Sequence, residues 1–220
     1  LMAGGKVQLS GEIVDTNNIK IEDFNGELFT EIYDKISSKL TLGDESTPFP
    51  YREWDNLIFK GISSVNNGSF NIEFVVPSSI EYDYGIGKVS LFATDTINYL
   101  EAIDNEQVII GGTSSEFNND KIGPEIDIFI DDYNFTSGNK VSKSPLLIVD
   151  VFDKNGLNIT ESKTFHKMTA ILNDTAEFYL NDYFSPKKDD HTSGSIRYPL
   201  DMLSPGKYKV EIKVSDNYNN

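Results

Sequence analysis

Residues 69–76 read Ser-Phe-Asn-Ile-Glu-Phe-Val-Val, and this stretch is the clearest guide to the fold. Its apolar residues Phe70, Ile72 and Phe74 alternate with polar ones. Successive side chains of a β-strand point to opposite faces, so this period of two predicts a strand with one buried and one wet face. The turn sequence Asn66-Asn67-Gly68 precedes this strand and predicts a hairpin.

The same alternation returns along the whole chain. It is clear in residues 6–13, 125–130 and 207–214, and within the last of these Ile212 is expected to be buried. Turn sequences such as Asp153-Lys154-Asn155-Gly156 separate the strands at intervals of roughly ten residues. Short strands divided by frequent turns are typical of β-sandwiches. The sequence therefore predicts an all-β chain.

A shift of composition in the middle of the chain predicts two domains. Gly111-Gly112 ends an apolar run, and residues 113–123 are mostly small and polar before Pro124 restarts the alternation. Each flanking segment has about a hundred residues, which is a common domain size. We therefore expect two consecutive immunoglobulin-like β-sandwich domains, at residues 1–112 and 124–220, joined by a linker at 113–123.

The charge of the chain excludes several classes of partner. Its 220 residues carry a formal net charge of -16. A negative field of this size repels phosphate backbones and anionic lipid surfaces, so no nucleic-acid partner is expected. No apolar run approaches the ~20 residues that a membrane-spanning helix needs, and the chain is not expected to span a membrane.

The residues needed for common catalytic sites are scarce. The chain has no cysteine, which removes thiol nucleophiles, disulfides and cysteine-based zinc sites. Its two histidines are His166, in a strand-like run, and His191, in a polar stretch that is expected to be a solvated loop. The sequence contains no Gly-x-Ser-x-Gly turn, which is the motif that exposes a serine nucleophile in α/β-hydrolases. We therefore expect no catalytic residue in this chain and no cofactor.

Three carboxylates near the ends of expected strands are candidates for a structural calcium site. They are Asp150, Asp153 and Asp216. Calcium prefers hard oxygen ligands from loops, but the sequence after Asp153 lacks the alternating ligands and the terminal Glu of an EF-hand loop. Ordinary turn chemistry is the preferred interpretation, and a structural calcium ion is the alternative.

The aromatic residues Phe49, Tyr51 and Trp54 form the other candidate site. They lie in the segment Pro48-Phe49-Pro50-Tyr51-Arg52-Glu53-Trp54, which contains two prolines and is expected to be a loop. Exposed aromatic rings bind sugars and protein partners, whereas buried ones close the open end of a sandwich. Packing is the preferred interpretation, and a ligand or partner surface is the alternative.

The order of several short motifs resembles that of a known family. It is similar to the region that follows the peptidase domain in the gingipain-like signal peptidases of the type IX secretion system. The likeness spans nearly the whole chain and rests on these motifs: Asp23-Phe24-Asn25-Gly26, Ile32-Tyr33-Asp34-Lys35, Leu42-Gly43, Phe59-Lys60-Gly61, Gly68-Ser69-Phe70, Phe74-Val75-Val76-Pro77, Ile110-Gly111-Gly112, Gly123-Pro124-Glu125-Ile126, Leu180-Asn181-Asp182-Tyr183-Phe184, Gly194-Ser195-Ile196 and Val214-Ser215-Asp216-Asn217.

This resemblance implies a parent protein that is a cysteine peptidase on the bacterial cell surface, associated with the outer membrane. Such peptidases remove C-terminal sorting signals from secreted proteins with a Cys nucleophile and a His partner. Neither His166 nor His191 matches that motif, so no catalytic residue carries over. The resemblance places the peptidase domain before Leu1. It makes that domain the first partner of this region, with secretion components or cargo as further partners.

Two functional hypotheses from different classes therefore remain. The first is a noncatalytic accessory region that braces or positions the peptidase domain of a gingipain-family cysteine peptidase. The alternative is a free-standing bacterial surface module for adhesion or glycan binding. An independent hydrolase is the least favoured reading, because the nucleophile and base are missing.

Overall fold

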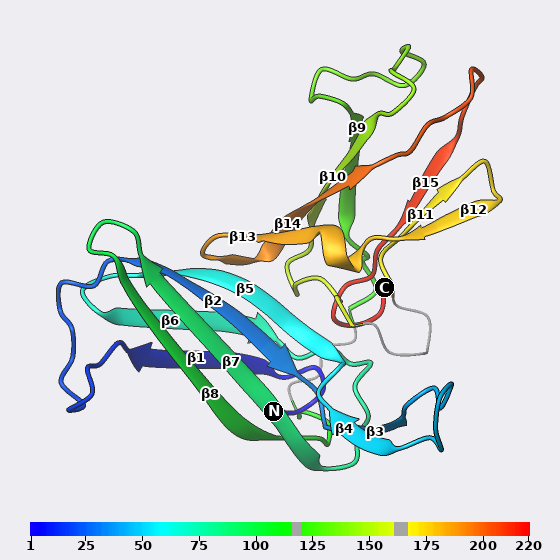
Figure 1. Cartoon of the computed structure of the whole chain (residues 1–220). Helices are drawn as coiled ribbons and strands as arrows, with labels where there is room; N and C mark the ends of the chain where they lie inside the picture. The colour runs from blue at the N-terminus through cyan, green and yellow to red at the C-terminus, as the bar shows by residue number, and fades with distance from the viewer. Residues whose placement is uncertain (116–119, 161–166) are drawn as a thin grey trace.

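The computed structural model describes residues 1–115, 120–160 and 167–220. In these ranges the regular structure consists of β-strands, with one short 3-10 turn, η1 (Asn181–Tyr183). The strands form two groups that meet near the C-terminus (Figure 1). The predicted all-β class is confirmed. Within the described ranges, no helix is long and apolar enough to cross a lipid bilayer.

The first group of strands lies between residues 6 and 110. Its strands pair antiparallel in a four-stranded sheet of order β5-β2-β7-β8, a two-stranded sheet β1-β6 and a separate hairpin β3-β4. The strands are β1 (Lys6–Glu12), β2 (Gly26–Tyr33), β3 (Ser37–Leu40), β4 (Pro50–Glu53), β5 (Leu57–Val65), β6 (Ser69–Val75), β7 (Gly85–Asp95) and β8 (Leu100–Ile110).

The core of the first group lies between its two larger sheets. On β2, Leu28 and Ile32 are buried while Phe29 faces outward, as the alternation of a half-buried strand requires. Ile72 and Phe74 of β6 belong to the same buried cluster. The layers therefore pack as a sandwich, as the sequence predicts.

The turn at Asn66-Asn67-Gly68 has the expected chemistry but a different role. Asn67 and Gly68 both have positive φ, of 49° and 69°, as in the tight turns of hairpins. One bridge pairs Asn66 with Ser69, but β5 then pairs with β2 and β6 pairs with β1. The turn thus carries the chain from one sheet of the sandwich to the other.

The second group of strands lies between residues 125 and 213. Its strands also pair antiparallel, in a four-stranded sheet of order β13-β14-β10-β9 and a three-stranded sheet of order β12-β11-β15. The strands are β9 (Glu125–Ile130), β10 (Leu146–Phe152), β11 (Thr169–Leu172), β12 (Ala176–Tyr179), β13 (Phe184–Lys187), β14 (Asp190–Pro199) and β15 (Val210–Lys213).

The core of the second group contains Leu147, Val149, Met168 and Ile196. Ile212 packs against this cluster from β15 but is only half-buried, so the expected full burial is wrong. β15 is the edge strand of its sheet, which leaves its side chains partly open to solvent.

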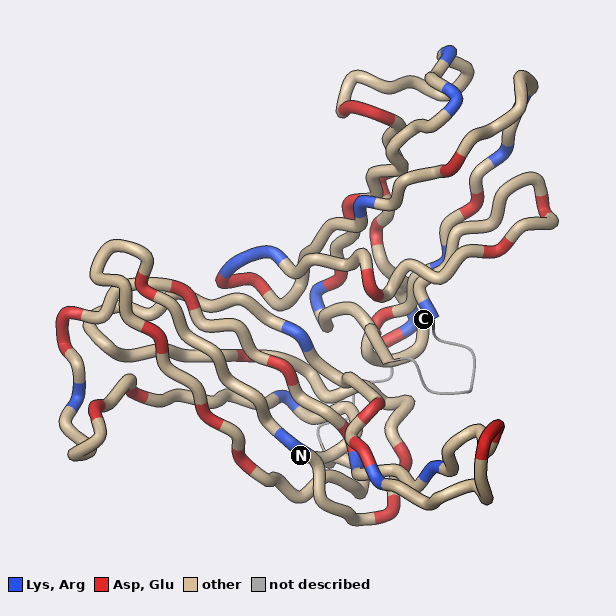
Figure 2. Tube along the Cα trace, in the orientation of Figure 1, with Lys and Arg blue, Asp and Glu red and all other residues tan. Residues whose placement is uncertain are grey.

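The described strands of each group pair only within that group, and each group surrounds its own buried cluster. Division into domains at 1–112 and 124–220, with a linker at 113–123, stays a prediction. Asp and Glu residues are spread over both groups (Figure 2).

The last five residues connect the two groups, and we call them the C-terminal bridge (Asp216–Asn220). Toward the first group, the amide of Ser78 donates to the Asn217 carbonyl oxygen over 2.8 Å. The side-chain amide of Asn219 donates to Ser78 Oγ over 2.7 Å.

The same bridge bonds to the second group and to the segment between the groups. The Asn217 amide donates to the Gly156 carbonyl oxygen over 3.1 Å, and Asn217 Nδ2 donates to the Asn155 carbonyl oxygen over 2.9 Å. Asn220 Nδ2 donates to the carbonyl oxygen of Asp120 over 3.0 Å. One short segment therefore bonds to all three parts.

A second contact between the groups comes from the tip of the β13–β14 hairpin, which lies against the free edge of β5. The Asp189 amide donates to the Ile62 carbonyl oxygen over 2.8 Å, and the Ser64 amide donates to Asp189 Oδ1 over 2.6 Å. Beside them, Lys188 forms a 3.0 Å ion pair with Glu27. These bonds hold the two groups together at a point well separated along the sequence from the C-terminal bridge.

The assignment of faces can be tested by core truncation. Ile72→Ala should lower the free energy of unfolding by about 2–5 kcal/mol, because it leaves a cavity in a packed core. Ile212→Ala should cost less, since that side chain is half-buried. Asn71→Ala, on the wet face of the same strand as Ile72, should stay within about 0.5 kcal/mol of the parent chain. Urea unfolding measures all three, and equal losses at positions 71 and 72 would contradict this assignment.

Candidate functional site

The three carboxylates proposed as calcium ligands occupy two different places. Asp216 is the first residue of the C-terminal bridge, and Asp153 lies close enough for the charge of Asp216 to act on it. Asp150 lies on β10 and instead accepts a long hydrogen bond, of 3.5 Å, from the hydroxyl of Tyr133. The structure therefore brings together only two of the three carboxylates that the sequence indicated.

The oxygens of these two carboxylates already accept hydrogen bonds from nearby amides. Asp153 Oδ1 accepts from the Asn155 amide over 2.7 Å. Asp216 Oδ1 accepts from the amides of Tyr218 and Asn220, over 2.9 and 2.8 Å. This is the turn chemistry that Asp commonly provides. In the described ranges, no group of three or more His, Cys, Asp or Glu side chains could hold a metal ion. Calcium binding stays a prediction.

The neighbourhood of Asp153 is strongly acidic. Burial raises the pKa of Asp153, and the charges of Asp216 and Asp120 raise it further. Lys154 forms a 3.0 Å ion pair with Asp120, and this bond lowers the pKa of the Asp120 carboxyl. One lysine thus faces three carboxylates where the two groups of strands meet.

His191 lies at the same meeting point, so the solvated loop expected from the sequence is wrong. The residue belongs to β14 and is half-buried. It lines a small cavity of about 20 Å³ with Phe59 and Phe74 of the first group and Phe184 of the second. The histidine is therefore part of the packing between the two groups.

The electrostatic surroundings of His191 come from both groups. Burial lowers the pKa of its imidazole, while Glu73 on β6 and the adjacent Asp190 act to raise it and Lys6 on β1 acts to lower it. No hydrogen bond joins His191 to a hydroxyl group among the described residues. His166 lies outside the described residues. Among the residues that the structure describes, the geometry around His191 therefore offers no paired base and nucleophile.

The aromatic candidates Phe49 and Tyr51 lie on a projecting arm, which we define as the β3–β4 hairpin and its connecting residues 41–49. The expected loop is wrong in part, because residues 50–53 form β4 and pair with β3. Phe49 is 69% exposed and Tyr51 is 39% exposed. These two rings are free to meet a ligand or a partner.

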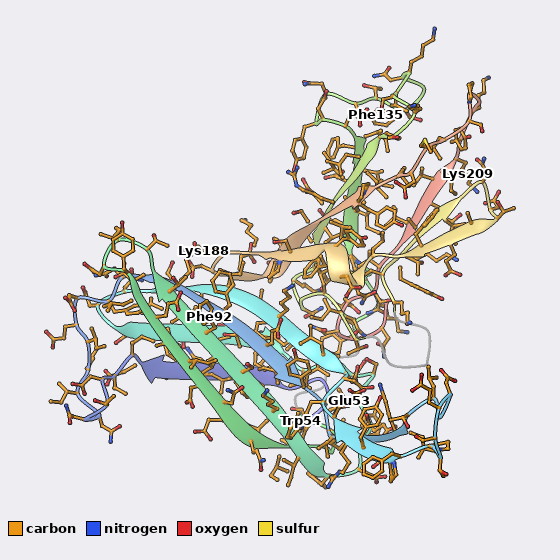
Figure 3. The ribbon with its side chains drawn as sticks, in the orientation of Figure 1. Glu53, Trp54, Phe92, Phe135, Lys188 and Lys209 are labelled. Carbon is orange, nitrogen blue, oxygen red and sulfur yellow. The ribbon has the colours of Figure 1, made fainter. Side chains whose placement is uncertain are left out.

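Trp54 behaves differently from the two rings on the arm. It lies beyond β4 and is half-buried (Figure 3). Its Nε1 donates to the Ile86 carbonyl oxygen over 3.3 Å, and Lys88 Nζ lies 5.9 Å from the ring centroid. Trp54 thus fixes the base of the arm against β7. Whether the three aromatic residues form a binding surface stays a prediction.

Sequence reasoning missed the contact between Asp189 and Ser64. These residues are 125 positions apart, and neither has a local pattern that marks it. The one signal in the sequence was that Asp189 is a polar residue of a kind common in turns. In the structure it lies in a turn with a positive φ of 59°. The pairing depends on how the two groups pack, which alternation along single strands does not encode.

Comparison with solved structures gives an informative likeness. No family model matches the chain, and no curated protein matches it. A crystal structure of dimeric latent PorU from Porphyromonas gingivalis is similar to it, with 30% sequence identity and a TM-score of 0.57. The similarity covers all of this chain and 21% of the PorU chain. This chain therefore resembles a PorU-like region about one fifth the length of that protein.

The junction around His191 predicts a pH dependence of stability. Because burial lowers the pKa of His191 in the folded chain, the unfolded chain binds the proton more readily below about pH 6.5. This contribution to stability is present above that pH and falls as the pH drops toward the folded pKa. As the pH falls from 7.5 to 5, we expect the free energy of unfolding of His191→Gln to rise relative to that of the parent chain.

Urea unfolding at several pH values measures this difference. Comparing the two chains at each pH cancels the contributions of the carboxylates, including the opposite contribution of Asp153. Parallel stability curves for the variant and the parent chain would show that His191 is not buried in its neutral form.

Proposed function

We propose that this chain is a noncatalytic accessory region of a surface-associated gingipain-family cysteine peptidase that processes the C-terminal sorting signals of secreted proteins. Its role would be to hold the peptidase domain in position, or to dock secretion partners. The observation that carries this proposal is the likeness to PorU, which extends over the whole chain at 30% identity.

The composition of the chain supports a noncatalytic role. It has no cysteine, so the nucleophile that a cysteine peptidase needs must come from another part of the parent protein. His191 is used in packing between the two groups of strands. The carboxylate of the adjacent Asp190 accepts a hydrogen bond from the Thr192 amide. These features favour a scaffold.

The junction supports a positioning role. A part that holds a catalytic domain in place must itself keep one shape, and independent modules joined by a loose linker would not. Here the C-terminal bridge and the Asp189 contact bond to both groups of strands. A fixed two-sandwich unit of this kind is suited to keep distant surfaces at a constant separation.

The projecting arm is the surface that we assign to the peptidase domain of the same polypeptide. It carries the exposed rings of Phe49 and Tyr51, and exposed aromatic residues are enriched where proteins meet. Lys39, Glu53 and Asp55 form ion pairs of 2.7 and 2.5 Å along the hairpin, which restrict its bending. A stiff arm with an apolar surface loses little entropy on docking.

Localisation at the bacterial cell surface, in association with the outer membrane, follows from the same proposal. Further partners would be components of the type IX secretion system or the exported cargo itself. The net charge of -16, with Asp and Glu residues spread along both groups of strands (Figure 2), favours basic rather than acidic partner surfaces. No part of this assignment requires a cofactor.

The proposal can be tested by replacing the matching segment of PorU with this chain. We expect the chimera to fold and cleave a reporter peptide, whereas PorU lacking the segment should lose activity or stability. A chimera carrying Phe49→Ser and Tyr51→Ser should be weaker than one carrying Ser38→Ala and Ser46→Ala. A chimera no better than the deletion would contradict the proposal.

The isolated chain supplies the second part of this test. It should cleave no peptide in a library assayed over roughly pH 4 to 9, the range in which carboxylates and imidazoles work as catalysts. Turnover that survives repurification and disappears in His191→Ala or His166→Ala would make the chain an enzyme in its own right.

A further inference from the structure

A polar cavity lies where the first group of strands meets the tip of the β13–β14 hairpin. We call it the Thr94 pocket. Its volume is about 410 Å³, within the range of ~300–1,000 Å³ that is usual for small-molecule sites. Its lining includes Glu27 of β2, Asn66 of the β5–β6 turn, Thr94 and Thr96 at the end of β7, and Lys188 of the hairpin tip. Figure 3 shows Lys188 at the hairpin that faces the first group.

The walls of this pocket are held firmly. Asp95, which follows Thr94, is buried and accepts hydrogen bonds from the amides of Asn25, Ile97 and Asn98 and from the Asn98 side chain. These bonds lower the pKa of Asp95 to about 2, and the bond from the Asn25 amide has the largest effect. A ligand would therefore meet a preformed wall.

The backbones of β2 and β7 approach each other closely at the pocket. A Cβ atom on Gly26 would overlap the carbonyl oxygen of Thr94, so only glycine fits there. This close approach fixes the position of Thr94 relative to the start of β2. Both Gly26 and Thr94 line the pocket, so this close approach fixes the distance between two of its lining residues.

Three polar side chains of the pocket are open to solvent, with Asn66 and Thr96 exposed and Thr94 half-buried. The side chains of Asn66, Thr94 and Thr96 make no hydrogen bond with another described residue. They offer one amide and two hydroxyls to a ligand. Glu27 and Lys188 neutralise each other in their 3.0 Å ion pair. The pocket thus presents uncharged donors and acceptors, and its lining has few apolar groups for a hydrophobic ligand.

An exposed aromatic residue, Tyr99, lies close in sequence to two residues of the pocket. Tyr99 follows Thr96 by three residues in the turn that Asp95 organises, and it is 91% exposed. Its φ is 55°, a conformation that bulky residues rarely adopt. Strained residues of this kind persist where the surroundings over-determine them, often at binding sites. The turn therefore fixes the backbone of Tyr99 and leaves its ring in solvent.

We propose that the Thr94 pocket binds a neutral saccharide of one or two rings. Hydroxyl groups of the sugar would bond to Asn66, Thr94 and Thr96, and the C–H face of a ring would pack on Tyr99. A ligand with negative charges is disfavoured, because the chain has a net charge of -16 and Lys188 is already paired. This site is separate from the projecting arm, and it does not depend on the identity of the parent protein.

The proposal can be tested by saturation-transfer NMR with a defined panel of neutral sugars. The panel is the methyl glycosides of glucose, galactose, mannose and rhamnose, together with N-acetylglucosamine, N-acetylgalactosamine and lactose. We expect at least one to bind, followed by calorimetric titration of the best. Thr96→Ala and Asn66→Ala should each weaken binding by about five- to tenfold, the effect of losing one hydrogen bond. Tyr99→Ala should weaken it by at least as much.

The matched control is Tyr51→Ala, which removes an exposed tyrosine from the projecting arm and should leave binding unchanged. Thermal unfolding verifies that each variant is folded. Failure of every sugar in the panel to bind overturns the proposal. Loss of binding in Tyr51→Ala, with retention in Tyr99→Ala and Thr96→Ala, also overturns it and moves the site to the arm. Neither result bears on the test with the PorU chimera.

Discussion

The orientation of the two groups of strands relative to each other depends on the hydrogen bonds of the last five residues. Asp216 is fully buried, with 0% exposure, and it organises the C-terminal bridge by accepting bonds from the amides of Tyr218 and Asn220. Buried carboxylates are tolerated when hydrogen bonds replace their hydration. With the turn fixed in this way, the bridge bonds to both groups of strands. The Tyr218 hydroxyl also donates a hydrogen bond to the carbonyl oxygen of Gly4, 214 residues away, over 3.1 Å.

Asp189 adds a second attachment between the two groups, at the edge of β5. Two attachments at separate points restrain rotation between the groups in a way that one cannot. The Thr94 pocket depends on this restraint, because Lys188 and Thr94 come from different groups.

The polar character of the junction has consequences for function. Interfaces within a chain that bury mainly hydrogen-bonding groups are specific in geometry, since each unpaired group would be costly. The two groups meet through serine, asparagine and aspartate as well as through Phe59 and Phe74. Such a junction suits a part that must hold other parts in place. It also brings the carboxylates of Asp120 and Asp216 close enough to raise the pKa of Asp153. The exposed features, which are the projecting arm and the Thr94 pocket, are then presented at fixed positions on a rigid body. A scaffold for a peptidase and a binder of sugars are compatible on these terms, because the two surfaces share no residue.

Some of this could be predicted from the sequence, and the rest depends on packing between segments that are far apart. The period of two in residues 69–76 gave the buried positions of Ile72 and Phe74, because the pleat of a strand forces that alternation. The same reasoning overstated the burial of Ile212. Alternation predicts which side chains face the core, but it does not predict how fully they are buried on an edge strand. Turn chemistry located the turn at Asn66–Gly68, but the strand with which each adjoining strand pairs is a long-range property.

For the candidate site, the local sequence identified Asp153 and Asp216, which lie close together. It also identified Asp150, which lies on β10 apart from them. His191 was expected in a solvated loop because its sequence neighbours are polar. Its burial comes from Phe59 and Phe74, more than a hundred residues earlier.

The contacts of the C-terminal bridge and of Asp189 are expected to hold the two groups of strands as one body with a fixed orientation. The chain contains no cysteine, so a spin label can be attached at chosen positions only. Asn105→Cys on β8 and Glu177→Cys on β12 place one label on each group, at exposed sites away from the junction. Double electron–electron resonance then measures the distance between the labels. The account predicts a single narrow distance distribution, which broadens when Asn217→Ala and Asp189→Ala are added together. A broad or multiple distribution in the labelled chain without those two substitutions would contradict it.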